Sequence, residues 1–327
     1  MSWRDVRRPS HRRPLQRSPP KPRSRARWSP GRGQRTAVRG YVFGTCVTTI
    51  GVSNEKMWDV DARAKNNVKI VGRDGGPTIV LAHGFGCDQN LWRLVTERLI
   101  ADYRVVLFDH VGAGASDPSA WDAERYSTLD AYAEDVLALV EDLDLRDVVF
   151  VGHSVASMIG VLAVAADPSR FAKLVLLTPS PRYVDDESDG YRGGFTRADI
   201  DELLESLEAN YLGWSQTMAP NIMGNPDRPQ LGGELTESFC RTDPAKALVF
   251  ARTTFLSDNR EDLARVRIPT LVIECARDSL APRHVGAYVH ERIEGSELVT
   301  LDASGHCPQL SAPEATTEAI TAFAGRR

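Results

Sequence analysis

The stretch Asp147-Val148-Val149-Phe150-Val151-Gly152-His153-Ser154-Val155-Ala156 decides the fold of this chain. Its first residues form a continuous apolar run, which is typical of a strand covered on both faces, and a helical composition follows from Met158 to Ala166. Between the two lies a serine on a short glycine-containing turn. A strand, a sharp turn bearing serine and a helix form a nucleophile elbow, which pushes the hydroxyl clear of the backbone. Taken alone, the short pattern also fits a surface serine, but this context predicts that Ser154 is a nucleophile.

The same rhythm of strand and helix extends outward from this stretch in both directions. Helical spacing of apolar residues is clear in the segment Leu129 to Leu143. Because buried strands alternate with helices, the sequence predicts the α/β class, with a mostly parallel, doubly wound sheet. The other apolar runs that predict strands are Thr78–Ala82, Arg104–Asp109, Leu174–Leu177, Thr270–Ile273 and Leu298–Leu301.

The rhythm breaks once, between Pro179 and Pro269, where the pattern is helical and no buried strand is evident. Thr196 and Asp199 have the spacing of a capping box at the start of one helix. A second helix is predicted to begin at Asp243-Pro244 and to run to about Phe255. We therefore expect a helical cap at about residues 180–265, inserted above the carboxyl ends of the strands, where open α/β sheets bind ligands.

A serine hydroxyl needs a base to remove its proton, and that base needs a group that orients it. His306 follows the last predicted strand, and Asp278 follows the strand before it, so both are expected at the same sheet edge as Ser154. The chain order Ser, Asp, His is the order that this kind of site uses. Asp302 is the alternative carboxylate because it is closer to His306 in sequence. The sequence predicts Ser154, His306 and Asp278 as a catalytic triad.

The turn His83-Gly84-Phe85-Gly86 follows the first long strand and can supply a backbone donor. Negative charge develops on the carbonyl oxygen during acyl transfer, and fixed N–H groups stabilise it. We expect the N–H groups of Phe85 and Val155 to form this oxyanion hole. The cap is expected to line an apolar substrate pocket with Phe195, Trp214 and Phe255.

No cofactor or metal is expected from the motifs. The turn Gly112-Ala113-Gly114-Ala115-Ser116 lacks the G-K-[ST] ending of a phosphate loop, and no metal-ligand spacing is present. The five cysteines form no C-x-x-C pair, which favours reduced thiols and a cytoplasmic location. No segment has the roughly 18 consecutive apolar residues of a membrane span, so no membrane partner is expected.

Composition divides the chain of 327 residues, which has a net charge of -4, into two parts. Residues 1–56 are rich in Arg, Pro and Ser and poor in apolar residues, and this composition predicts a disordered basic tail. Such a tail could bind nucleic acid, but an extension with no folded role is the simpler interpretation. Residues 57–327 are expected to form one enzyme-sized domain.

Several stretches carry a resemblance to a known family: His83–Gln89, Phe108–Gly112, Gly152–Val155, Asn210–Trp214, Asn225–Pro229, Phe239–Pro244 and Gly305–Pro308. Together they resemble the RsbQ family of bacterial α/β-hydrolases, which act in energy-stress signalling and are related to the plant strigolactone and karrikin receptors. The resemblance runs from about Asn67 to the C-terminus and implies the α/β-hydrolase fold.

Two positions depart from the family pattern. Ala156 stands where glycine is common, and its small methyl group is expected to be accommodated. His110 stands where tyrosine is common, and this change is expected to alter either the pocket rim or the partner surface.

Two functions follow from the motifs and the resemblance. The first is a serine hydrolase that cleaves a small hydrophobic ester, lactone or similar acyl compound through an acyl-enzyme. The alternative is a ligand-sensing signalling hydrolase that activates a stress-response phosphatase similar to RsbP. The resemblance supports both, because the related proteins combine a working triad with a signalling role.

Overall fold

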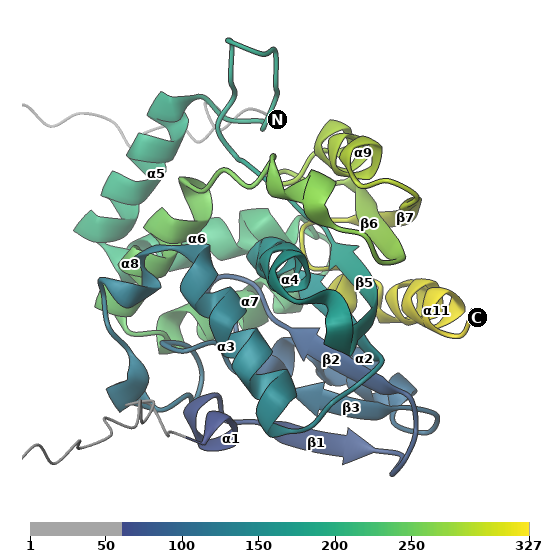
Figure 1. Ribbon diagram of the computed structural model, residues 1–327. Coiled ribbons are helices and arrows are strands. Elements are labelled where there is room, and N and C mark those ends of the chain that lie inside the picture. Colours follow the sequence, from purple (N-terminus) through teal and green to yellow (C-terminus); the bar gives the residue numbers. More distant parts are fainter. Residues whose placement is uncertain (1–60, 327) are drawn as a thin grey trace, which may run out of the picture. The chain divides into compact units, whose positions relative to one another are not determined.

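The computed structural model describes residues 61–326, which contain a seven-stranded sheet with the strand order β1-β3-β2-β4-β5-β6-β7 (Figure 1). All neighbouring strands are parallel except β1, which runs antiparallel to β3. The predicted tail at residues 1–56 and the predicted start of the domain at residue 57 lie outside the described residues. The strands are β1 (Lys69–Gly72), β2 (Thr78–Ala82), β3 (Arg104–Leu107), β4 (Val148–His153), β5 (Phe171–Leu177), β6 (Thr270–Arg277) and β7 (Glu297–Ser304).

The central strands β2 and β4 are buried along their whole length, and this explains why their sequences are apolar without alternation. They pair in parallel, with Val80 opposite Phe150. Strand β1 is different, because all of its residues are exposed and it forms an edge of the sheet. The sequence analysis did not predict β1, since its short Lys-Ile-Val-Gly run has none of the features of a buried strand.

Helices cover both faces of the sheet, as the doubly wound prediction requires. On one face, α3 (Leu129–Asp142), α4 (Val155–Ala166) and α9 (Arg283–Arg292) contribute to the larger core. On the other face, α2 (Arg93–Leu99) packs against α11 (Pro313–Ala324) in a separate core. Short helices complete the secondary structure: α1 (Ala62–Lys65), α10 (Pro308–Ser311) and the 3-10 turns Gln89–Trp92, Pro118–Ala120, Arg125–Ser127, Pro168–Arg170 and Asp262–Arg265.

The segment between β5 and β6 contains four helices, which Figure 1 shows grouped on the side of the molecule away from α11. They are α5 (Arg197–Ala209), α6 (Tyr211–Met223), α7 (Pro229–Arg241) and α8 (Pro244–Phe255). The predicted capping box at the start of α5 is present. Asp243 caps α8, and Pro244 is its first residue. We call these four helices the cap.

The α/β-hydrolase fold predicted from the sequence is therefore confirmed in its sheet and in the helices on both faces. Among residues 61–326, no helix combines the length and the apolar character that crossing a membrane would require.

Candidate active site

Ser154 lies between the end of β4 and the first residue of α4, on a sharp turn. Its φ of 57° is positive, a conformation that non-glycine residues adopt only when their surroundings impose it. Close packing explains why Gly152 precedes it, because a Cβ at residue 152 would lie 2.3 Å from the carbonyl oxygen of Ala156. Ala156 itself is fully buried in α4. The turn thus places Ser154 directly before the first residue of α4.

The structure brings Ser154, His306 and Asp278 into one hydrogen-bonded chain. The Nε2 atom of His306 lies 2.8 Å from the Ser154 Oγ atom, and its Nδ1 atom lies 2.8 Å from Asp278 Oδ2. The backbone positions of the three residues follow from the sheet, since Asp278 and His306 come just after β6 and β7. The other carboxylate considered, Asp302, has a side chain that is 97% exposed and pairs with Arg277. The structure therefore places Asp278, and not Asp302, behind the imidazole.

Asp278 is held in place by the loop that follows it. Its Oδ1 atom accepts hydrogen bonds from the backbone N–H groups of Leu280, at 2.8 Å, and Ala281, at 3.1 Å. With Oδ1 occupied in this way, Oδ2 is left to accept the Nδ1 proton of His306. This proton assignment leaves Nε2 free to take the proton of Ser154.

The backbone N–H groups of Phe85 and Val155 are both available beside the serine. Within residues 61–326, neither group donates a hydrogen bond to a protein acceptor. For Val155 this follows from its position as the first residue of α4, where the N–H has no partner inside the helix. The loop that carries Phe85 packs closely on the elbow, because a Cβ on Gly84 would lie 3.1 Å from the Cβ atom of Ser154.

Ser154 and His306 face a small apolar cavity under the cap. The cavity has a volume of about 20 Å³, which is enough for about one water molecule. Its walls are mostly aromatic and aliphatic, so a substrate that enters must displace side chains. The apolar walls include Phe85, Tyr183, Ile222, Phe239, Phe255 and Leu280.

Of the three cap residues predicted to line the pocket, Phe255 does so and the other two do not. Trp214 stacks on Phe239, with ring centroids 5.7 Å apart, and meets the edge of Phe85 at 6.2 Å. Phe195 lies behind Tyr183, with centroids 6.4 Å apart. The predictions for Trp214 and Phe195 were therefore wrong, because their rings fill the layer behind the pocket wall.

Tyr183 is a site residue that the sequence analysis missed. Its hydroxyl lies 3.5 Å from the Ser154 Oγ atom, and burial raises its pKa to about 12, so it stays protonated at neutral pH. No local pattern marks this tyrosine, because its approach to Ser154 depends on how the loop before α5 is anchored.

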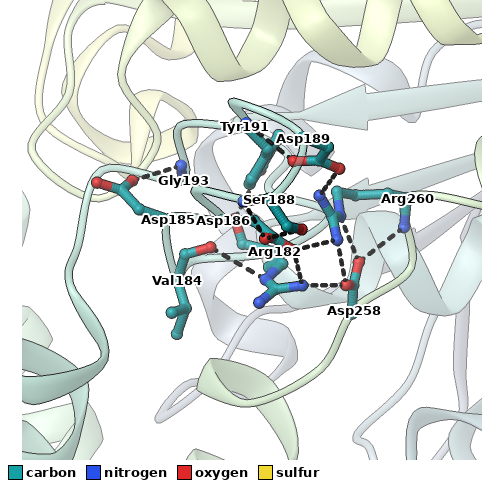
Figure 2. Close-up of polar contacts among 10 residues, drawn as sticks. All are labelled: Arg182, Val184, Asp185, Asp186, Ser188, Asp189, Tyr191, Gly193, Asp258 and Arg260. Carbon is teal, nitrogen blue, oxygen red and sulfur yellow. Dashed lines mark hydrogen bonds and ion pairs between the residues drawn. The ribbon is translucent and has the colours of Figure 1, made fainter.

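The anchor of that loop is a cluster of ion pairs at the two ends of the cap (Figure 2). Arg182 and Arg260 each bind both Asp186 and Asp258, and Figure 2 shows both guanidinium groups turned toward Asp258. Arg260 is only 13% exposed, and it also pairs with Asp189. This cluster ties the loop of Tyr183 to the segment that follows α8, and so fixes the roof of the cavity.

The cluster predicts a specific pH dependence of stability. Hydrogen bonds from the hydroxyl and N–H of Ser188, and then from Arg260, lower the pKa of Asp186 from 3.8 to about 2. A carboxyl group whose pKa is lowered by folding stabilises the protein above its unfolded pKa, and this contribution is lost as the pH falls through the folded value. Urea unfolding between about pH 4 and pH 2 should therefore depend less steeply on pH in Asp186→Asn than in the wild type. Asp302→Asn serves as an exposed control and should behave as the wild type.

Three further histidines lie close to the site, and all are buried. His153 donates from Nε2 to the carbonyl oxygen of His306 at 2.8 Å, and burial lowers its pKa to about 3. Burial likewise lowers the pKa of His110 well below its usual value. His110 contacts His83 and is 1% exposed, so it is buried and does not itself line the cavity. The lowered pKa values keep His110 and His153 neutral, and both act as packing groups.

Thiol and metal chemistry find no support near Ser154 in the part of the chain that the structure describes. Cys87 and Cys307 line the cavity, but burial raises the pKa of both thiols, which keeps them protonated. Residues 61–326 contain no group of three or more His, Cys, Asp or Glu side chains arranged to hold a metal ion.

Comparisons with known proteins show which family the chain resembles. The sequence profile of the alpha/beta hydrolase family matches residues 79–319. The chain is 42% identical over 248 residues to the strigolactone esterase D14 of Arabidopsis thaliana, which covers 76% of this chain and 91% of that protein. It is 40% identical over 250 residues to the karrikin insensitive 2 receptor IA of Petunia hybrida, covering 76% of this chain and 90% of that protein.

A solved structure is similar over nearly its whole length. A hydrolase from Oleispira antarctica superposes with a TM-score of 0.78 at 40% sequence identity, and the match covers 82% of this chain and 97% of that one. The family profile spans both the elbow and the strands on either side of it. On this evidence the chain belongs to the alpha/beta hydrolase family.

Proposed function

We propose that this protein is a serine hydrolase that cleaves a small hydrophobic ester, lactone or similar acyl compound. The observation that carries the proposal is the chain of two 2.8 Å contacts from Asp278 through His306 to Ser154, which ends at an apolar cavity. A relative named as a strigolactone esterase, 42% identical to this chain, supports the same reaction class.

The proposed reaction passes through a covalent acyl-enzyme. His306 Nε2 takes the proton from Ser154 as the oxygen attacks the substrate carbonyl, and Asp278 stabilises the imidazolium that forms. The N–H groups of Phe85 and Val155 bind the oxyanion of the tetrahedral intermediate. The intermediate then expels the alcohol, which receives the proton from His306. A water molecule activated by the same imidazole attacks the acyl-enzyme and releases the acid.

Labelling of Ser154 tests this proposal directly. A fluorophosphonate probe should attach to one residue at a stoichiometry close to one, and peptide mass spectrometry should locate the adduct on Ser154. Ser154→Ala should remain unlabelled. A probe adduct on another residue, or equal labelling of the variant, would refute the assignment of the nucleophile.

The size of the cavity predicts the substrate preference. Since the free space holds about one water molecule, each methylene added to the acyl chain must push the aromatic walls further apart, and overpacking costs about 1–3 kcal/mol. In a series of p-nitrophenyl esters, kcat/KM should therefore be higher for two-carbon and four-carbon acyl groups than for a sixteen-carbon group, by about 100-fold or more.

A pair of variants separates the effect of a ring in the cavity wall from the effect of a ring elsewhere in the core. Phe255→Ala removes a ring that lines the cavity and should improve the relative kcat/KM of longer esters. Phe171→Ala removes a buried ring that packs on Phe150, away from the cavity, and should leave the chain-length profile unchanged. Equal or better cleavage of the sixteen-carbon ester by the wild type would contradict the small-pocket interpretation.

A second candidate function, a ligand sensor, is supported by the relative named as a karrikin insensitive 2 receptor. In this proposal the protein is RsbQ-like, and slow hydrolysis in the same pocket changes its affinity for a partner such as an RsbP-like phosphatase. The two functions differ in kinetics. A sensor should turn over slowly, and its ligand should alter binding of the purified phosphatase in a titration. Fast multiple turnover, with no effect of ligand on partner binding, would favour the enzyme alone.

A further inference from the structure

The stretch Asn225-Pro226-Asp227-Arg228-Pro229, which the sequence analysis singled out, has no part in the triad itself. It forms the turn between α6 and α7, which we call the cap turn (residues 224–228). The turn begins with Gly224 in the left-handed conformation, with φ of 62°, at the end of α6. Asn225 is buried, at 7% exposure, although it lies in a connection between two surface helices. A buried amide in a turn requires hydrogen-bond partners, and these partners indicate its role.

The partners belong to the loop that carries the candidate base, which we call the histidine loop (residues 304–306). The side-chain amide of Asn225 donates to the carbonyl oxygen of Ser304 at 2.8 Å. The backbone N–H of His306 donates to the carbonyl oxygen of Ile222, in α6, at 2.9 Å. The cap therefore holds the histidine loop on both sides of Gly305.

Arg228 fixes which way the amide of Asn225 faces. Its guanidinium donates to the Oδ1 atom of Asn225, and also to the carbonyl oxygen of Ser311 at 2.8 Å. Because the amide oxygen accepts from Arg228 Nη2, the amide nitrogen must face the carbonyl oxygens of Met223 and Ser304. Arginine and asparagine thus act as one unit that clamps α6 to the histidine loop.

The opposite side of the histidine loop is held by the sheet. The carbonyl oxygen of His306 accepts hydrogen bonds from His153 Nε2, at 2.8 Å, and from Thr178 Oγ1, at 3.2 Å. The donors are His153, the last residue of β4, and Thr178, which follows β5, so both belong to the sheet and not to the cap. The backbone of His306 is therefore held on two sides. Its carbonyl oxygen accepts from His153 and Thr178 on the sheet, and its N–H donates to Ile222 on the cap.

We infer that Asn225 is a positioning residue, which sets the distance between His306 Nε2 and Ser154 Oγ by tying the histidine loop to the cap. The inference rests on the proposed serine hydrolase function. Its physical basis is the steep dependence of proton transfer on geometry, since a displacement of about 1 Å can reduce the rate by about 100-fold. Asn225 does not line the cavity, so it acts on the rate of the chemical step and not on substrate binding.

The test is the steady-state kinetics of Asn225→Ala on a short-chain p-nitrophenyl ester. We expect kcat per folded molecule to fall by about 100-fold while KM stays within about threefold. Asn259→Ala is the matched control, because Asn259 is also 7% exposed but its amide pairs with Asp262. The control should keep kcat within about threefold of the wild type.

An effect of the variant on folding is separated from an effect on the chemical step by measuring the fraction of molecules with a reactive serine. Titration with the fluorophosphonate probe gives the fraction of molecules that can react, and kcat is divided by that fraction. If Asn225→Ala does not fold, Asn225→Asp provides a variant of the same shape, in which an oxygen replaces the donor that faces Ser304. Its labelling rate should fall in proportion to its kcat.

The coupling to Arg228 gives an independent check. If Arg228 acts through Asn225, the double variant Asn225→Ala/Arg228→Ala should have the same kcat as Asn225→Ala alone. A kcat of the double variant that falls by the product of the two single-variant losses would contradict the interpretation that Arg228 and Asn225 act as one unit. A wild-type kcat in folded Asn225→Ala, with Ser154→Ala inactive, would overturn the positioning role while leaving the proposed function intact. Activity retained in Ser154→Ala would instead overturn the proposed function itself.

Discussion

Replacing Ser154 with alanine is expected to lower kcat/KM for p-nitrophenyl acetate by a factor of about 10⁴ or more. The variant removes the Ser154 Oγ atom, which lies 2.8 Å from His306 Nε2 and is the proposed nucleophile. The oxyanion donors and the cavity remain. Its free energy of unfolding should change by about 1 kcal/mol or less, since a single hydrogen bond of a hydroxyl is lost. The absorbance of released nitrophenolate measures ester hydrolysis, and urea unfolding measures the stability.

Ser157→Ala is the matched control for this variant. Ser157 lies in α4, the helix that follows Ser154, and is fully buried; its hydroxyl donates to the carbonyl oxygen of Gly152 at 2.8 Å. The control should lose some stability and keep its activity. If Ser157→Ala and Ser154→Ala lost activity to the same extent, the loss would come from distortion of the elbow, and the nucleophile assignment would lose its main support.

Replacing Gly305 with alanine is expected to have the largest effect on stability. Gly305 has φ of 87°, and a Cβ built on it would lie 1.7 Å from the carbonyl oxygen of Met223. Left-handed backbone costs about 1–2 kcal/mol for a residue with a Cβ, and forced overpacking costs about 1–3 kcal/mol more. The free energy of unfolding should therefore fall by about 2–5 kcal/mol. Because relief of the clash would move the histidine loop, activity of the folded fraction should fall too.

Gly295→Ala separates the cost of the left-handed backbone from the cost of the steric clash. Gly295 also has a positive φ, of 71°, but a Cβ there would have nothing within 4 Å. This variant should lose only the conformational part, about 1–2 kcal/mol, and keep full activity. Urea unfolding measures the loss of stability in both variants, and ester hydrolysis measures their activity. Equal losses of stability in the two variants would mean that Met223, at the end of α6, does not press on the histidine loop.

Much of the fold was predictable because its signals are local. The strands from β2 to β7 are apolar runs, and the capping signals at Thr196 and Asp243 mark the starts of α5 and α8 at the residues where the helices begin. Strand β1 was missed for the opposite reason. It is an exposed edge strand that pairs with β3 through backbone hydrogen bonds, and these bonds leave no pattern in the side chains.

The pocket was harder to predict than the hydrogen-bonded chain of Ser154, His306 and Asp278. Trp214 and Phe255 both lie in cap helices and both are buried, so composition cannot distinguish the ring that lines the cavity from the ring behind it. Which of them faces Ser154 depends on how α6 and α8 are turned relative to the sheet. Tyr183 was missed because the Arg182–Arg260 cluster that fixes its loop joins residues far apart in sequence.

By itself, the sequence determined the parallel sheet, the elbow at Ser154 and the edge of the sheet at which Asp278 and His306 lie. It could do so because each of these depends on a short apolar run and on the residue that ends it, and parallel strands bring their carboxyl ends to one edge. The tertiary structure decided which carboxylate meets His306, which rings close the cavity and how the cap turn holds the histidine loop. These contacts join segments far apart in sequence, such as Asn225 and Ser304, which are separated by 79 residues. They depend on the rotation and packing of whole helices, which no local pattern encodes.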